Sequence, residues 1–252
     1  MRHLVVLLML VGIAQAQEPS RDTPSFGTTV VIPAGLHGTV YFIPEGTRVL
    51  PDFEHDPLER VGEVWTDMLK IAPRHWRSGF PGLTDRFEWF AIDYTGRFWI
   101  ETPGRYTFAL LSDDGSRLFI DDSPIIDDDC QHSPDLRVAA VKLEGGGHRI
   151  RVSYFQGPRD CLALILAIAG PDQQWKPFDT REFKPPSNPE DWHFPNSSSV
   201  SVVPTTPAEA SLNIHDILRL AGDTDLYGKA ADKRHHHENS CQYFQAFRTC
   251  SR

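Results

Sequence analysis

Short segments in which apolar and polar residues alternate dominate residues 34–171 and constrain the fold. The alternation is found in residues 87–94, 97–100, 106–111, 138–143, 149–155 and 162–168. Turn signals separate these segments, at Thr95-Gly96, Thr102-Pro103-Gly104, Asp114-Gly115 and Glu144-Gly145-Gly146-Gly147. A period of two places alternate side chains on one face of a strand. The pattern predicts an all-β domain, either a two-sheet sandwich or a barrel.

The rest of the chain is less regular. Residues 64–69 are compatible with a short helix or a strand, and residues 73–81 indicate a loop that contains Trp76. Residues 172–210 are rich in Pro, Ser, Asn and Asp and are predicted to form a linker. Residues 211–252 form a C-terminal extension, in which Ser211 is expected to cap a short α-helix over 212–221 that ends at Gly222.

The N-terminus has the features of a secretion signal. A basic start, an apolar run over 4–13 and the small-x-small site Ala14-Gln15-Ala16 predict a signal peptide over residues 1–16. The run is too short to span a membrane, and no later segment is long enough. We therefore expect a protein that is secreted, periplasmic or held at the cell envelope after cleavage.

An oxidising compartment would favour disulfides. The chain has four cysteines, at positions 130, 161, 241 and 250, which allow three connectivities. We favour Cys130–Cys161 and Cys241–Cys250, because each pair lies within one region of similar character.

The charge balance excludes one class of partner. The formal net charge is −9 and the sequence pI is about 5.6. Nucleic acid is not expected to bind, because the sequence has no basic patch to replace the counterions of the phosphates.

Aspartates gather in one predicted hairpin. Seven of them lie between Leu110 and Cys130, around the short apolar segments 118–120 and 125–126. With a turn over 121–124, Ile120 would face Ile125 and Arg117 would face Asp128. Asp113-Asp114 and the triplet 127–129 would then meet at the same end. Clustered carboxylates repel one another unless a cation holds them, and hard oxygen ligands suit Ca²⁺.

Residues 38–171 resemble the PA14 domain. The resemblance rests on residues 38–46, 89–96, 98–108, 112–121, 147–150 and 154–158. It implies an antiparallel β-sandwich of a kind found in secreted and cell-surface proteins. In the adhesin branch of the family the domain is a calcium-dependent lectin, in which two adjacent aspartates joined by a cis peptide hold the ion. Asp113 and Asp114 occupy that position here.

The resemblance also suggests further ligands. Gln156 stands where the adhesins have an asparagine, and it keeps the carbonyl oxygen on a longer side chain. Asp128, with its neighbours in the triplet 127–129, is a possible additional ligand. A Cys130–Cys161 bond would tie the late loop 156–160 to the acidic hairpin.

Each of these features also has a plain structural interpretation. Asp-Gly is a strong turn signal, so Asp113-Asp114-Gly115 can be a turn alone, and the triplet 127–129 can be a solvated loop. Trp76 in its loop could stack on a sugar, whereas Trp89 and Trp99 are expected in the core. The run 235–237 of three histidines lacks the spacing of a metal site.

No catalytic motif is visible, since the sequence has no Gly-x-Ser-x-Gly elbow, His-Glu-x-x-His or phosphate loop. We therefore expect a non-enzymatic module that binds a glycan through Ca²⁺ at Asp113 and Asp114. The alternative is a structural or protein-interaction module at the cell envelope, with an envelope protein as its partner.

Overall fold

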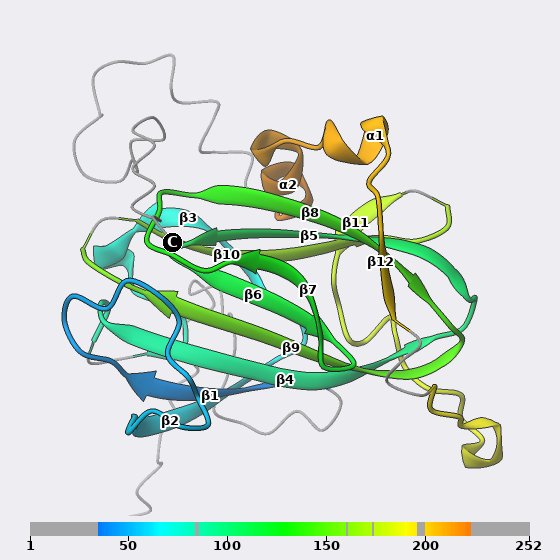
Figure 1. The fold of residues 1–252 in the computed structure, drawn as a ribbon, viewed down its shortest axis with the longest axis horizontal. Coiled ribbons are helices and arrows are strands. Elements are labelled where there is room, and N and C mark those ends of the chain that lie inside the picture. Colours follow the sequence, from blue (N-terminus) through cyan, green and yellow to red (C-terminus); the bar gives the residue numbers. More distant parts are fainter. Residues whose placement is uncertain (1–34, 84–85, 160, 173, 196–199, 223–252) are drawn as a thin grey trace, which may run out of the picture.

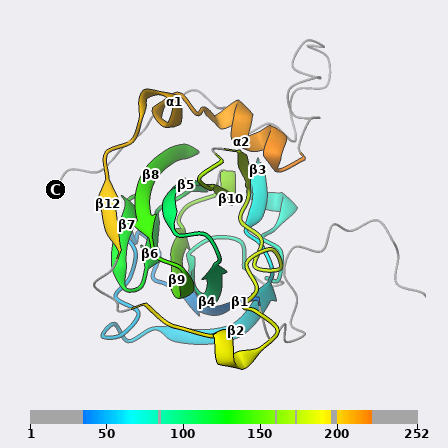
Figure 2. The same cartoon turned by 90° about the vertical axis from the view of Figure 1, so that its right-hand side faces the viewer.

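Two antiparallel sheets of six strands each lie face to face (Figures 1 and 2). The computed structural model describes residues 35–83, 86–159, 161–172, 174–195 and 200–222. The predicted all-β antiparallel sandwich is confirmed. The predicted signal peptide, the histidine run 235–237, Cys241 and Cys250 lie outside the described residues.

The first sheet has the strand order β2-β1-β4-β9-β6-β7. Its strands are β1 (Leu36–Phe42), β2 (Glu59–Thr66), β4 (Phe90–Ile100), β6 (Ser116–Ile120), β7 (Ser123–Asp128) and β9 (Gly146–Gln156). The longest pairing, between β4 and β9, runs from Phe90 opposite Gln156 to Ile100 opposite Gly146.

The second sheet has the order β11-β10-β5-β8-β12, and β3 also pairs with β10. Its strands are β3 (Lys70–His75), β5 (Gly104–Asp113), β8 (Asp135–Leu143), β10 (Cys161–Ala169), β11 (Trp175–Pro177) and β12 (Ser201–Val203). The helices α1 (Pro207–Ala210) and α2 (Ile214–Leu220) lie over the outer face of this sheet (Figures 1 and 2). None of the helices in the described ranges is both long and apolar enough to cross a membrane.

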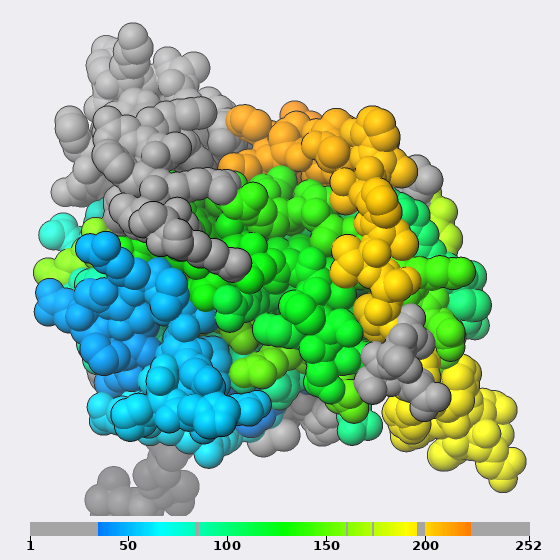
Figure 3. Space-filling model, viewed as in Figure 1, coloured from blue at the N-terminus to red at the C-terminus, as the bar shows by residue number. Residues whose placement is uncertain are grey.

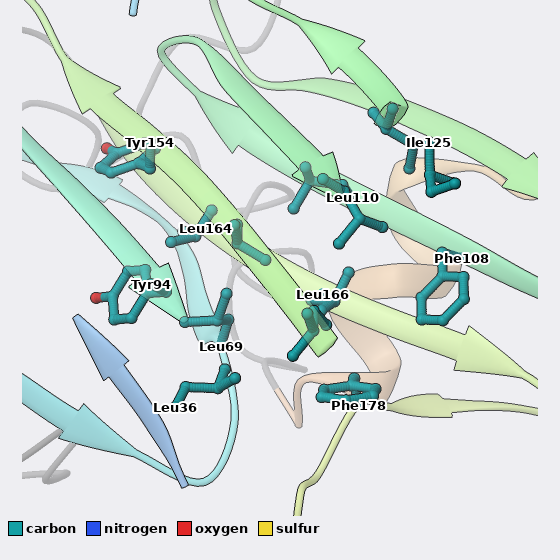
Figure 4. Close-up of a cluster of buried hydrophobic side chains, with 14 of the residues drawn as sticks. Leu36, Leu69, Tyr94, Phe108, Leu110, Ile125, Tyr154, Leu164, Leu166 and Phe178 are labelled. Atoms are coloured by element: carbon teal, nitrogen blue, oxygen red, sulfur yellow. The ribbon is translucent and has the colours of Figure 1, made fainter. Parts of the chain in front are cut away.

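The main core fills the space between the sheets (Figure 4). It combines aliphatic and aromatic side chains from both inner faces, among them Leu36, Leu69, Tyr94, Phe108, Leu110, Tyr154, Leu164, Leu166 and Phe178. Each of these nine side chains is at most 1 % exposed. Fully burying such a side chain contributes about 1.5–3 kcal/mol, so the sandwich is held mainly by this layer.

The predicted turn at Thr95-Gly96 is wrong, because β4 continues through it from Phe90 to Ile100. The glycine has a packing reason instead. A Cβ at Gly96 would lie 2.8 Å from the side chain of Leu36 on the neighbouring strand β1. The absent side chain lets the two strands of the first sheet pack closely.

The predicted register of the acidic hairpin is also wrong. Ile120 pairs with Ser123 rather than Ile125, and Arg117 pairs with Asp127. The turn needs only Asp121 and Asp122, which have φ values of 47° and 65° and so fit a two-residue hairpin turn. An irregularity between Leu118 and Phe119 then realigns the strands. Both acidic groups still lie at one end, since Ser116 faces Asp128.

The regions outside the predicted strands also differ. Of residues 64–69, which are compatible with a helix or a strand, 64–66 form the end of β2, and β3 occupies part of the predicted loop 73–81. The segment predicted as a linker contributes β11 and β12 to the second sheet and buries Phe178 completely. The predicted helix begins later than expected, at Ile214, and its N-cap is Asn213 rather than Ser211.

Candidate functional site

Asp113 and Asp114 lie at the end of β5, where the chain turns into β6. Both residues are 5 % exposed, although aspartate is rarely buried. The peptide bond between them is cis, as the family resemblance implies. The sandwich therefore encloses two neighbouring acidic residues at one of its ends, the left-hand end in Figure 1, toward which β5 and β9 run.

Asp114 ties two loops to this turn. Its Oδ1 accepts a hydrogen bond from the backbone N–H of His132 at 3.0 Å, and its Oδ2 accepts one from Gly157 at 2.8 Å. Hydrogen bonds from backbone N–H groups favour the charged form of a carboxyl group. The loop after β7 and the loop after β9 are thus held against one buried carboxylate.

Gln156 lies next to Asp114, but it presents its amide nitrogen rather than its oxygen. The nitrogen is 2.9 Å from the carbonyl oxygen of Cys161 and 3.5 Å from Asp114 Oδ2. The amide oxygen accepts a hydrogen bond from the hydroxyl of Tyr154 at 2.6 Å. A rotated amide would set its oxygen against the Cys161 carbonyl oxygen, so the observed orientation is favoured. In this orientation Gln156 positions Asp114.

Tyr154 is a part of the site that the sequence did not reveal. Its buried hydroxyl lies 2.6 Å from the backbone oxygen of Asp113 and 2.6 Å from the amide oxygen of Gln156. The single hydroxyl hydrogen is shared between these two acceptors. Burial raises the pKa of Tyr154 well above its ordinary value, and the nearby Asp113 and Asp114 raise it further. The hydroxyl therefore stays protonated and remains a donor. The sequence predicted only that Tyr154 lies in a strand.

Asp128 lies in the same end of the sandwich with partners of its own. Its carboxylate is 2.9 Å from Arg137 Nε and 3.2 Å from His132 Nε2. The neighbouring aspartates of the triplet contact Arg117, with Asp127 at 3.1 Å and Asp129 at 2.9 Å. The triplet is therefore engaged in ion pairs that link β6, β7 and β8.

The two cysteines within the described residues are both disulfide-bonded. Cys130 follows the acidic triplet, and the Cys161 carbonyl holds Gln156, so both belong to the loops around the site. The pairing Cys130–Cys161 stays a prediction.

Trp76 lies in a short 3-10 turn directly after β3, whose last residue, His75, pairs with Cys161. Its ring contacts two guanidinium groups, with Arg77 at 5.5 Å and Arg159 at 5.0 Å from the ring centroid. Arg159 also pairs with Glu88 at 2.8 Å. Trp76 is therefore near the late loop, but its ring already packs against cations.

The other tryptophans differ from one another. Trp99 is 7 % exposed and belongs to the core as predicted. Trp89 precedes β4 with a φ of 56° and is only half-buried, against the small cluster that includes Phe155.

Within the described ranges no group of three or more His, Cys, Asp or Glu side chains is arranged to hold a metal ion. The carboxylate oxygens at the site come from Asp113 and Asp114, and the backbone carbonyls of Asp113 and Cys161 lie beside them. Carboxylate and carbonyl oxygens are the donor types that Ca²⁺ prefers.

Comparison with known proteins gives a match to one protein family over part of the chain. The family model of the PA14 domain matches residues 72–179. The comparison with curated proteins found no significant match.

Among solved structures, the PA14 domain of the antifreeze protein MpAFP has a TM-score of 0.48 and 20 % identity, over 66 % of this chain and 94 % of that domain. A PA14 sugar-binding domain from an RTX adhesin has a TM-score of 0.48 and 15 % identity, over 59 % of this chain and 96 % of that one. An anti-sigma factor domain-containing protein has a TM-score of 0.46 and 24 % identity, over 62 % of this chain. The chain spans 50 % of the length of that last protein.

Proposed function

We propose that this chain, whose residues 72–179 match the family model of the PA14 domain, binds carbohydrate through a calcium ion held at Asp113 and Asp114. The proposal includes no bond-breaking chemistry. It places the mature protein outside the cytoplasm, secreted or at the cell envelope, because of the predicted signal peptide over 1–16.

The observation that carries the proposal is the burial of two adjacent acidic residues at the turn between β5 and β6. Asp113 and Asp114 are each 5 % exposed. Two neighbouring carboxylates withdrawn from water raise each other's energy when both are charged, and a divalent cation relieves that repulsion. The position of this pair also matches the family motif.

The residues present fit such an ion. Asp113 and Asp114 would supply carboxylate oxygens, and the loop of Gly157 to Arg159 would supply backbone carbonyls. Gln156 would hold the Asp114 carboxylate and Tyr154 would hold the backbone of Asp113, rather than bind the ion, because of the hydrogen bonds described above. When bound, the ion would order these loops and coordinate hydroxyl groups of a sugar.

Two other predicted residues take lesser parts in the proposal. Asp128 supports the site through His132, whose backbone N–H reaches Asp114. Trp76 could border a bound glycan only if its ring moved away from Arg77 or Arg159. We therefore assign the main interactions to Asp113 and Asp114.

Calorimetric titration of Ca²⁺ into EDTA-stripped protein tests the proposal. We expect stoichiometric binding for the wild type and none for the double variant Asp113→Asn/Asp114→Asn. Asp122→Asn is the matched control, since this aspartate lies in the turn at the other end of the hairpin, with a side chain that is 78 % exposed. This control should bind Ca²⁺ as the wild type does.

A glycan array, probed with Ca²⁺ and with EDTA, tests the second half of the proposal. Retention that requires both Ca²⁺ and the Asp113–Asp114 pair supports a lectin. Calcium binding with no retained glycan would leave the ion a structural role. Absence of calcium binding in a folded protein would favour the alternative, a structural or protein-interaction module with an envelope protein as its partner.

A further inference from the structure

A groove of about 310 Å³ lies at the opposite end of the sandwich from Asp113 and Asp114. We call it the distal groove. Its aromatic lining residues are Phe98, Trp99, Phe183, Trp192 and Phe194, and its cationic ones are Arg97 and Lys184. β4 and β9 reach this end with Ile100 and Gly146, and the yellow segment that follows β11 lies against it on the right-hand side of Figure 1.

Exposed aromatic side chains mark the distal groove. Trp192 is 44 % exposed and Phe194 is 58 % exposed, and they are the two aromatic members of the exposed large hydrophobic residues in the described part of the chain. Figure 3 shows the yellow residues near position 190 projecting from the body at the lower right. Grouped exposed apolar side chains of this kind are typical of binding surfaces.

The walls of the groove are held in place before any ligand arrives. The backbone N–H of Trp99 donates to Phe183 O at 2.8 Å, and that of Gly147 donates to His193 O at 2.9 Å. The indole N–H of Trp192 donates to Pro186 O at 2.8 Å. A groove fixed in this way loses little conformational entropy on binding.

The two glycines at the start of β9 serve this arrangement rather than a turn alone. A Cβ at Gly146 would lie 2.8 Å from the backbone oxygen of His193, and one at Gly147 would lie 2.7 Å from the ring of Phe194. Gly146 also has a φ of 120°. The two glycines therefore allow residues 192–194 to pack directly against the backbone of β9.

Charge indicates which ligand fits. Arg97 and Lys184 line the groove, no acidic side chain of the described residues does, and the guanidinium of Arg97 lies 5.7 Å from the ring centroid of Phe194. Among the described residues, neither cation forms an ion pair with a carboxylate, although Lys184 is close enough to Asp179 to help lower the pKa of that carboxyl group. Two neighbouring cations outside any ion pair are unusual on a chain with a net charge of −9. Together with the aromatic lining, they favour a ligand that has a negative charge beside an apolar group.

The lining favours a peptide over a sugar. Thr180 is the one side-chain hydroxyl among the described lining residues, and no Asn, Gln, Asp or Glu lines the groove. Such planar polar groups fix the orientation of small polar ligands, whereas aromatic grooves accept proline-containing or aliphatic peptide segments. We propose that the distal groove binds a peptide segment of a partner protein, with a proline or aliphatic anchor next to an acidic residue.

This site is independent of the proposed calcium site, and its test separates the two. Selection from a random peptide phage library against the full chain should enrich sequences that combine Pro or Leu with Asp or Glu. Fluorescence polarisation with the enriched peptides should show binding at least about tenfold weaker for Trp192→Ala, as for residues central to an interface. Arg97→Glu should weaken it similarly.

Two control variants test whether the loss of peptide binding is specific to the distal groove. Val202→Ala shortens another exposed apolar side chain, 56 % exposed on β12, and should leave peptide binding unchanged. Asp113→Asn/Asp114→Asn should also leave it unchanged. Urea midpoints near that of the wild type would show that the variants fold.

Three binding results would overturn the proposal. In the first, the selection yields no peptide whose binding depends on Trp192. In the second, the enriched peptides are basic. In the third, the protein is retained on a glycan array and this retention depends on Trp192. Dimerisation in light scattering that Trp192→Ala abolishes would assign the groove to a second copy of the chain and overturn it as well.

Discussion

Gly115 allows the Asp113–Asp114 turn and the Cys130 loop to lie against each other. A Cβ at this position would lie 2.9 Å from both the backbone N and the backbone O of Cys130, and would overlap the ring of Phe155. We expect Gly115→Ala to destabilise the fold by about 1–3 kcal/mol, because a well-packed site must shift to admit the methyl group. Urea denaturation of both proteins measures this change.

Gly62→Ala is the matched control for this substitution. Gly62 lies in β2, and a Cβ added there would have no neighbouring atom within 4 Å. The same change should therefore alter stability by at most about 0.5–1 kcal/mol, in the stabilising direction. An equal loss in both variants would show that backbone preference, not the contact with Cys130, determines the effect. Weaker Ca²⁺ binding in Gly115→Ala alone would tie this glycine to the site.

Single residues also show why the site was only partly predictable. Asp113 and Asp114 stood out because adjacent carboxylates are visible in the sequence. The orientation of the Gln156 amide is not visible in the sequence. It is determined by the Cys161 carbonyl and the Tyr154 hydroxyl, which only the fold brings next to it. The partners of Asp128, which are Arg137 and His132, likewise meet it only through the packing of β7 against β8.

At the scale of elements, α1 is fastened to β5 by Glu209. Its carboxylate accepts hydrogen bonds from Arg105 at 2.6 and 2.9 Å and from the hydroxyl of Thr107, and it completes a capping box with Thr206. The hydrogen bond from Arg105 lowers the pKa of Glu209 strongly, burial opposes this shift, and Thr107 and Thr206 reinforce it. The charged form of Glu209 is therefore the one that holds α1.

Glu209→Gln should cost about 1–2 kcal/mol at neutral pH, which allows for the partial exposure of Arg105. Because the folded pKa is lowered, this stabilisation is present above the unfolded pKa of about 4.3 and is lost as the pH falls through the folded value. Urea midpoints of the two proteins should thus differ at pH 7 and converge in acid. Glu190→Gln, at an exposed residue, should match the wild type throughout; a gap that persists in acid would contradict a role for the charge.

Strand prediction succeeded for the central strands and failed where a partner determines the structure. β5, β8, β9 and β10 all cover segments that the sequence predicts as strands, although β10 is a continuous apolar run whose residues are all buried. β12 has three residues in a Pro- and Ser-rich region and exists because it pairs with the edge of β8. Local composition contains no information on such an edge, so the sequence predicted a linker there.

At the scale of the whole molecule, residues 172–222 contact both the outer face of the second sheet and the core. Ile217 and Leu218 of α2 pack on the outer face of the second sheet with Ile165 and Ala167. Phe178 enters the main core. The same region supplies Trp192 and Phe194 to the distal groove, so one segment closes the core and forms the surface at the end opposite Asp113 and Asp114.

Phe178 gives the sharpest test of this organisation. It is fully buried, with its ring centroid 5.3 Å from that of Phe183 and 5.4 Å from that of Phe98, and its N–H donates to Leu166 O at 2.9 Å. Phe178→Ala should therefore lower the free energy of unfolding by about 3–5 kcal/mol, the cost of removing a buried aromatic side chain. Phe194→Ala, at a residue that is 58 % exposed, should change it by at most about 0.5 kcal/mol.

A chain that ends after Pro171 extends the same test. It would lose the strands that pair with β8 and with the second half of β10, and the core would be open where Phe178 lies. We expect this shortened chain to have a lower urea midpoint than Phe178→Ala, or to aggregate because edge strands are exposed. If it instead unfolded at the urea concentration of the full chain, residues 172–210 would act as the linker that their composition predicts, and the sandwich would be stable without them.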